Sequence, residues 1–324
     1  MRALGRDGLL AVIILALLAG IAVITPSFIT PGNLRDVFND TSILVMLALG
    51  QMVVIVARCI DLSVAANIAL TGVLVALVNA AHPEIPVPLL MLGCLVVGGL
   101  LGAFNGALVW IVRIPPIVVT LGTLSIYRGL SFIASGGTSV VGRQMSPSFI
   151  GIPRLEILGL PALSWFAIIT IAIFAVLLSW TRLGRSFFAA GGNPTAAVYT
   201  GINVGRTQFI AFVISGSIAG LCGYLWVTRY TIAYVDIAGG FELTVIAACV
   251  IGGVSIAGGI GTVTGAVLGA LFLGIVKNAL PVINVSPFAQ LAISGVVIIA
   301  AVVINARNER RQGRLILKAA ESAA

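Results

Sequence analysis

Charged residues are scarce in this 324-residue chain: Asp, Glu, Lys and Arg make up 9% of it, against about 25% in soluble proteins. Hydrophobic residues make up 60%, and the mean hydropathy is +1.17. So few charges cannot cover a surface that faces water, which excludes a soluble globular protein. The apolar runs are long and continuous, unlike the alternating segments of a membrane β-barrel. The chain is therefore predicted to be an all-α integral membrane protein.

Residues that carry catalytic chemistry are also few, with one histidine, four cysteines and two lysines. The cysteines, Cys59, Cys94, Cys222 and Cys249, show no metal-ligand spacing and fit small buried hydrophobic side chains. Neither lysine follows a glycine-rich loop, so the chain has no P-loop for nucleotide hydrolysis. HExxH and GxSxG motifs are absent as well. We therefore expect no catalytic residue and no metal site, and predict that the chain is not an enzyme.

Ten apolar stretches approach the length of about 20 residues that a membrane-spanning helix needs. They lie at residues 8–25, 41–57, 62–80, 87–112, 115–134, 161–180, 206–228, 241–256, 260–280 and 286–305. We expect the first to be an uncleaved span, because no clear small-residue cleavage site follows it. Only SIAGGIG separates the eighth from the ninth, so either both cross fully or one is bent or re-entrant.

The charges divide unequally between the two sides of this ten-helix bundle. If the N-terminus is cytoplasmic, the inner segments hold twelve basic and four acidic residues, and the outer segments and span ends hold six of each. The whole net charge of +8 then lies inside, as the positive-inside rule requires. This predicts cytoplasmic termini, a transmembrane domain over 1–306 and a basic cytoplasmic tail over 307–324. The asymmetry also explains the basic charge through membrane topology, without a nucleic-acid partner.

The longest inner loop between spans is TRLGRSFFAAGGNPTAAVYTGINVGR, at residues 181–206. Asn193 is a good N-cap and Pro194 a good first helical residue, which predicts a short helix over 194–202. The loop is either an ordinary polar connection or a docking helix for a cytoplasmic partner. Carboxylates lie mostly near span ends, whereas ion-coupled transporters tend to keep them deep in the membrane. A motor in a separate subunit is therefore favoured over the alternative, a stand-alone secondary sugar transporter or facilitator.

Four stretches resemble the permease subunits of bacterial ABC importers of the ribose-type monosaccharide family. They are VVIVARCIDLSVAANIAL (53–70), PPIVVTLGTLSIYRGL (115–130), AAGGNPTAAVYTGINVGR (189–206) and AACVIGGVSIAGGIGTVTGAVLGALFLGIVKNAL (247–280). The first departs from the family pattern, with Arg58-Cys59 in place of Gly-Gly and Ala65-Ala66 in place of Gly-Ser. The resemblance therefore does not imply ribose itself, since relatives import rhamnose, other pentoses and hexoses, sugar alcohols and the quorum-sensing autoinducer.

The resemblance implies a multi-pass subunit of the bacterial inner membrane that works in a larger import machine. Its expected partners are a second permease chain, as a homodimer or heterodimer, a separate ATP-binding subunit, a periplasmic sugar-binding protein and the membrane lipid. ATP and Mg²⁺ would be used by the ATP-binding subunit, and no cofactor is expected on this chain. The family loop supplies a coupling helix, which here matches residues Gly191, Gly192, Asn193, Pro194, Ala196, Ala197, Gly201 and Ile202.

Seven polar residues in or beside the spans are candidates for the translocation path: Asp61, Ser63, Asn67, Asn105, Thr120, Thr123 and Arg128. Structural roles compete with this interpretation. Asp61 and Ser63 equally fit the capping of a helix start, and the two amides fit hydrogen bonds between helices. The threonines can bond to their own helix. Arg128 either lines the path, contacts the binding protein or extends toward the outer surface.

Glycines recur at helical spacing in two of the predicted spans. They are Gly98, Gly102 and Gly106 in the fourth span and Gly261, Gly265 and Gly269 in the ninth. Small residues four apart allow two helix backbones to approach closely in a membrane. We therefore predict that both sets pack against neighbouring helices.

Overall fold

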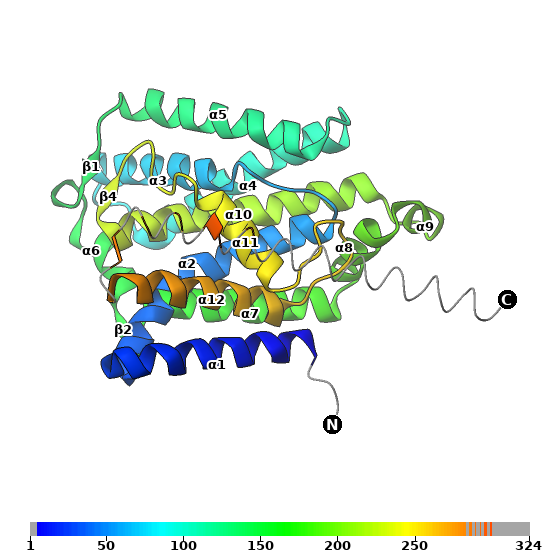
Figure 1. Ribbon diagram of the computed structural model, residues 1–324. Coiled ribbons are helices and arrows are strands. Elements are labelled where there is room, and N and C mark those ends of the chain that lie inside the picture. The colour runs from blue at the N-terminus through cyan, green and yellow to red at the C-terminus, as the bar shows by residue number, and fades with distance from the viewer. Residues whose placement is uncertain are drawn as a thin grey trace.

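The computed structural model describes residues 5–282, 285–286, 289, 292, 295–296 and 299. In this part of the chain the helices form a bundle whose long members run side by side (Figure 1). The predicted span at 286–305 falls mostly outside the described residues, and the predicted tail at 307–324 falls wholly outside them.

Among the described residues, eight helices are long and apolar enough to cross a membrane. They are α1 (Arg6–Ile24), α2 (Pro31–Val56), α3 (Val64–Ala81), α4 (Val87–Trp110), α5 (Pro116–Ser135), α7 (Ala162–Trp180), α10 (Val204–Tyr230) and α12 (Val263–Val282). Each overlaps one of the predicted spans. The prediction of an all-α membrane protein with many spans is thus confirmed, although the described residues do not establish ten.

The predicted eighth span is shorter than expected. Helix α11 covers only Phe241–Ile251, which is 11 residues, or about 16 Å at 1.5 Å per residue. It stops where Gly252 and Gly253 follow, and Gly253 has φ +93°, a left-handed conformation that glycine adopts without steric cost. Residues 252–262, which form no helix or strand, then lead into α12.

Short elements mark the two ends of the bundle (Figure 1). At one end lie α8 (Arg182–Gly192) and α9 (Pro194–Tyr199), which is also the end at which α1 begins. At the other end lie η1 (Pro26–Ile29), η2 (Gly142–Gln144), α6 (Pro147–Gly151), η3 (Ile152–Arg154) and the strands β1 (Val140–Val141), β2 (Glu156–Ile157), β3 (Leu160–Pro161) and β4 (Ile232–Ala233). Strand β1 pairs antiparallel with β4, and β2 with β3. We call these ends the α8–α9 end and the strand end.

The core is built around α2, α3 and α10, and α10 packs along α4. Helix α2 is almost wholly buried over its apolar length, whereas α1 is mostly exposed at one edge of the bundle. The close α4–α10 contact depends on glycine: a Cβ on Gly98 would lie 2.3 Å from the Gly216 carbonyl oxygen, and one on Gly102 would lie 2.1 Å from that of Phe212. Gly106 faces Phe209 in the same way.

The second glycine set lies mainly against α11. A Cβ on Gly265 or Gly269 would lie 2.1 Å or 2.0 Å from the carbonyl oxygen of Gly252 or Ala248, respectively. Gly261 lies two residues before α12 begins, so it is not part of that helix. The prediction that placed it within a spanning helix is wrong. Gly261 lies instead beside the side chains of Val56 and Met52 of α2.

Candidate functional site

A buried polar network surrounds the connection between α2 and α3, residues 57–63. The Asp61 carboxylate is 2% exposed and accepts hydrogen bonds from the Ser63 hydroxyl at 2.6 Å and the Ser63 N–H at 2.9 Å. The Asn105 side-chain amide donates to the Ser63 hydroxyl oxygen at 2.8 Å. The Tyr127 hydroxyl lies 3.4 Å from the Asn105 carbonyl oxygen. The network thereby joins the start of α3 to α4 and α5.

The backbone of the same connection is also held by side chains from several helices. In the orientation that satisfies both of its ends, the Gln51 side-chain amide pairs with the N–H and carbonyl of Asp61, at 3.2 Å each. Gln208 of α10 donates to the Ala57 carbonyl at 3.1 Å, and the Thr120 hydroxyl donates to that of Ile60 at 3.2 Å. Buried backbone groups are costly without partners, so these side chains allow an irregular segment to lie inside the bundle.

Burial raises the pKa of the Asp61 carboxyl, which lies in this connection outside the spanning helices, while the hydrogen bonds from Ser63 act in the opposite direction. The buried surroundings of the Asp61 carboxyl thus disfavour its charged form, whereas Ser63 supplies hydrogen bonds to one of its oxygens. These contacts favour the structural role for Asp61 and Ser63. A role in the translocation path stays a prediction for both residues.

The other residues predicted to line the translocation path lie apart from one another. Asn67 donates to the Gly98 carbonyl at 3.2 Å and lies 3.4 Å from that of Gly216, so it joins α3 to α4 and α10. Its side-chain oxygen is buried and has no hydrogen-bond partner among the described residues. Thr123 lies 3.4 Å from the Thr120 carbonyl of its own helix. The amides therefore bridge helices, whereas Thr123 bonds within α5.

Arg128 lies toward the strand end of α5, away from the Asp61 network. It forms an ion pair with Asp236 in the segment between β4 and α11, and the side chain of Arg128 is 23% exposed. A charged group in a spanning helix is costly unless it is paired or faces water. The pair satisfies that requirement and ties α5 to the segment that leads into α11.

The predicted helix start at Asn193-Pro194 is confirmed. The Asn193 side-chain oxygen accepts a hydrogen bond from the Ala196 N–H at 3.0 Å, and Pro194 is the first residue of α9. Helix α9 ends at Tyr199, earlier than the predicted residue 202, because the Ile202 N–H turns back to the Ala197 carbonyl and Gly201 has φ +83°.

The end of α8 contacts the segment between α11 and α12, which the sequence did not indicate. Gly191 and Gly192 lie against Gly258 and Gly259. The Gly259 N–H also donates to the carbonyl of Val56, the last residue of α2, at 2.9 Å. Residues 191–192 thus meet both the end of α2 and the irregular 252–262 segment. The paired glycines in each segment were the only signal in the sequence.

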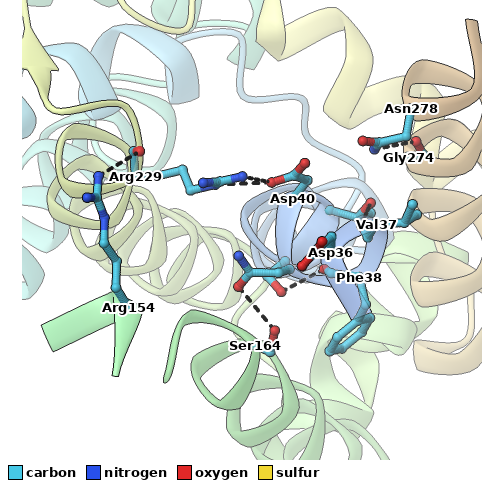
Figure 2. A network of polar contacts seen from close by, with 12 residues as sticks. Asp36, Val37, Phe38, Asp40, Arg154, Ser164, Arg229, Gly274 and Asn278 are labelled. Atoms are coloured by element: carbon cyan, nitrogen blue, oxygen red, sulfur yellow. Dashed lines mark hydrogen bonds and ion pairs between the residues drawn. The ribbon is translucent and has the colours of Figure 1, made fainter. Parts of the chain in front are cut away.

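A second polar cluster, at the strand end, was also missed by sequence reasoning (Figure 2). Asp40 of α2 forms an ion pair with Arg229 at the end of α10. Arg154 donates to the Thr228 carbonyl at 3.2 Å, and the Ser164 hydroxyl lies 3.2 Å from the Asn39 side-chain oxygen. The partners lie more than 70 residues apart in the chain, so no local pattern of the sequence indicated these pairs.

Comparison with known proteins decides the family. The family model described as the permease component of the branched-chain amino acid transport system matches residues 33–302. The chain belongs to this permease family. It is 37% identical to the D-allose transport system permease protein AlsC of Escherichia coli over 86% of this chain and 84% of the relative. It is 36% identical to the autoinducer 2 import system permease protein LsrC of Shigella flexneri over 92% and 86%.

A third relative is the L-arabinose ABC transporter permease protein AraH of Azospirillum brasilense, at 33% identity over 95% of this chain and 90% of the relative. No solved structure matches the chain. The resemblance to ABC importer permeases is thus confirmed. The chain is a transport permease, a multi-pass protein of the bacterial inner membrane.

Proposed function

We propose that this permease moves a monosaccharide or a related small polyol into the cell, driven by ATP hydrolysis in a separate subunit. The observation that carries the proposal is similarity over at least 86% of the chain to permeases named for D-allose and L-arabinose transport. Those relatives are named as parts of transport systems, which supports an ATP-driven permease over a stand-alone transporter. A second permease chain completes the channel, as a copy of this chain or a related one.

The α8–α9 end faces the cytoplasm in this proposal. Basic residues gather in the connections and helix ends there: Arg58, Arg113, Arg182, Arg185 and Arg206. Basic residues of short loops are enriched on the cytoplasmic side of a membrane. Segment 191–202 is then the coupling helix region that binds the ATP-hydrolysing subunit. Its exposed apolar side chains, Val198 at 60% and Tyr199 at 87%, suit such a protein contact.

The strand end then faces the periplasm, where a sugar-binding protein delivers the substrate. Both strand pairs and the short helices α6, η2 and η3 lie at this end. They form surface outside the long helices that a soluble partner can contact. Lipid covers the exposed apolar side chains around the bundle, such as Leu15 of α1 and Leu100 of α4.

Reconstitution in liposomes tests the proposed function. Vesicles with the permease, its ATP-hydrolysing subunit and the binding protein are expected to take up radiolabelled sugar only with ATP. Vesicles with the permease alone are expected to show no flux. ATP-independent flux through the permease alone would contradict the proposal in favour of a facilitator.

A branched-chain amino acid is a second candidate substrate, because the matching family model carries that description. The same vesicles, given labelled leucine, separate the two. Uptake of leucine without uptake of any pentose or hexose would replace the sugar in the proposal by an amino acid.

A further inference from the structure

A cavity of about 570 Å³ lies at the strand end, between α2, α10, α12 and the segment that leads into α11. Small-molecule sites in proteins have volumes of roughly 300–1,000 Å³. Its lining combines aromatic and polar side chains, including Asp40, Trp226, Tyr230, Asp236, Lys277 and Asn278. None of these residues belongs to the Asp61 network or to the coupling segment. The cavity is therefore a separate feature of the bundle.

The polar residues of α12 indicate that the cavity holds water. Lys277 and Asn278 lie within a spanning helix, where polar groups face a partner or a water-filled space. The Lys277 ammonium lies 5.1 Å from the centre of the Phe241 ring, and Asn278 donates to the Gly274 carbonyl at 2.9 Å. That hydrogen bond uses one of the two amide hydrogens of Asn278, so a second donor and the side-chain oxygen are left for other groups.

Aromatic rings form one wall of the same cavity. The Trp226 ring centre lies 5.3 Å from that of Tyr230 and 4.9 Å from that of Phe241. Flat apolar rings beside amide, carboxylate and ammonium groups suit a ligand that is apolar on one face and rich in hydroxyl groups at its edge. A monosaccharide ring has this character, with C–H groups on its faces and hydroxyl groups around its rim.

The carboxylates of the lining are not available to bind the ammonium group of an amino acid. Asp40 is paired with Arg229, and Asp236 is paired with Arg128. Both carboxylates of the lining thus have guanidinium partners, so neither is free to neutralise the ammonium group of a zwitterion. Their remaining oxygen lone pairs can still accept hydrogen bonds from hydroxyl groups.

We propose that this cavity is a low-affinity binding site for a monosaccharide at the strand end of the permease. The inference rests on the proposed sugar transport and adds the place at which the sugar enters this chain. Trp226 and Tyr230 contact the apolar face of the ring, and Asn278 hydrogen bonds to its hydroxyl groups. Lys277 donates to a further hydroxyl.

Protection of a single cysteine tests the site directly. Tyr234, which also lines the cavity and is 40% exposed, is replaced by cysteine (Tyr234→Cys) in the full-length permease bound to its ATP-hydrolysing subunit. The four native cysteines are buried and give little background. D-allose or L-arabinose at about four times its dissociation constant is expected to slow labelling by a water-soluble thiol reagent about fivefold. Leucine is expected to have no effect, and Ser148→Cys, at the same end outside the cavity, is the control.

Asn278→Ala provides the second arm, with Asn33→Ala as its matched control. Both amides donate to a backbone carbonyl, Asn33 to that of Phe28 at 2.7 Å, but only Asn278 lines the cavity. In the Tyr234→Cys background, Asn278→Ala is expected to raise about tenfold the sugar concentration that gives half-protection, the equivalent of about 1.4 kcal/mol. Asn33→Ala is expected to leave that concentration unchanged.

The outcomes separate this inference from the proposed function. If the complete importer takes up sugar but no sugar protects Tyr234→Cys, the cavity is not the binding site and the proposed function stands. If the importer takes up leucine and no sugar, the proposed function is wrong, and the sugar site that rests on it is wrong as well. Protection by leucine, or equal protection of Ser148→Cys, would also overturn the sugar site.

Discussion

At the scale of single residues, the Asp61 network shows how an irregular segment is accommodated inside an apolar bundle. The 57–63 connection carries backbone groups that no helix satisfies, and Gln51, Gln208 and Thr120 supply their partners. Asp61 and Ser63 satisfy each other and are linked through Asn105 to α4. Polar residues in these spans therefore serve packing first, and any role in transport must be separated from it by substitution.

The variants Asp61→Asn and Asp61→Ala distinguish a role of this residue in packing from a role in transport. An asparagine oxygen can still accept both hydrogen bonds from Ser63, so Asp61→Asn is expected to leave the thermal unfolding midpoint in detergent nearly unchanged. Asp61→Ala leaves buried donors without a partner and is expected to lower the free energy of unfolding by about 1–3 kcal/mol. If Asp61→Asn unfolds normally but abolishes ATP-dependent uptake, the carboxylate itself is needed and the purely structural role is wrong.

At the scale of elements, α8 is positioned to pass movement to the irregular 252–262 segment. Gly191 contacts the last residue of α2 and Gly259 through backbone atoms alone. Contact without intervening side chains leaves little room for independent movement. If a motor subunit displaces α8–α9, the 252–262 segment and the end of α2 are parts that the end of α8 contacts directly.

Gly191→Ala and Gly192→Ala form an adjacent matched pair for this contact. A Cβ at Gly191 would lie 1.8 Å from the Val56 carbonyl oxygen, whereas one at Gly192 would meet only the Gly259 Cα, at 3.7 Å. Overpacking against backbone is expected to cost about 1–3 kcal/mol for Gly191→Ala, with a matching loss of ATP-dependent uptake. Gly192→Ala is expected to retain wild-type stability, because its added methyl group meets only an ordinary van der Waals contact. Equal thermal stability of the two variants would show that the close contact is unimportant.

At the scale of the whole molecule, the sequence predicted what depends on local patterns. Apolar run length predicted the long helices, and Asn193-Pro194 predicted the start of α9, because both signals act within one element. It did not predict that α11 would stop at Ile251, since the apolar run continues past Gly252 and Gly253 as far as Ile256. It also missed contacts such as Arg229 with Asp40 and Gln208 with Ala57, which join residues more than 150 positions apart. Such contacts depend on helix packing, which a single sequence does not specify.

The orientation of the whole bundle is the last prediction, and the buried native cysteines make it accessible. Thr195 of α9 and Ser148 of α6 are both exposed and lie at opposite ends of the bundle. In intact cells whose outer membrane admits small reagents, an impermeant thiol reagent is expected to label Ser148→Cys at once. It is expected to label Thr195→Cys only after the inner membrane is permeabilised. The reverse pattern would place α9 outside, where it cannot meet a cytoplasmic motor, and would contradict the coupling proposal while leaving the fold unchanged.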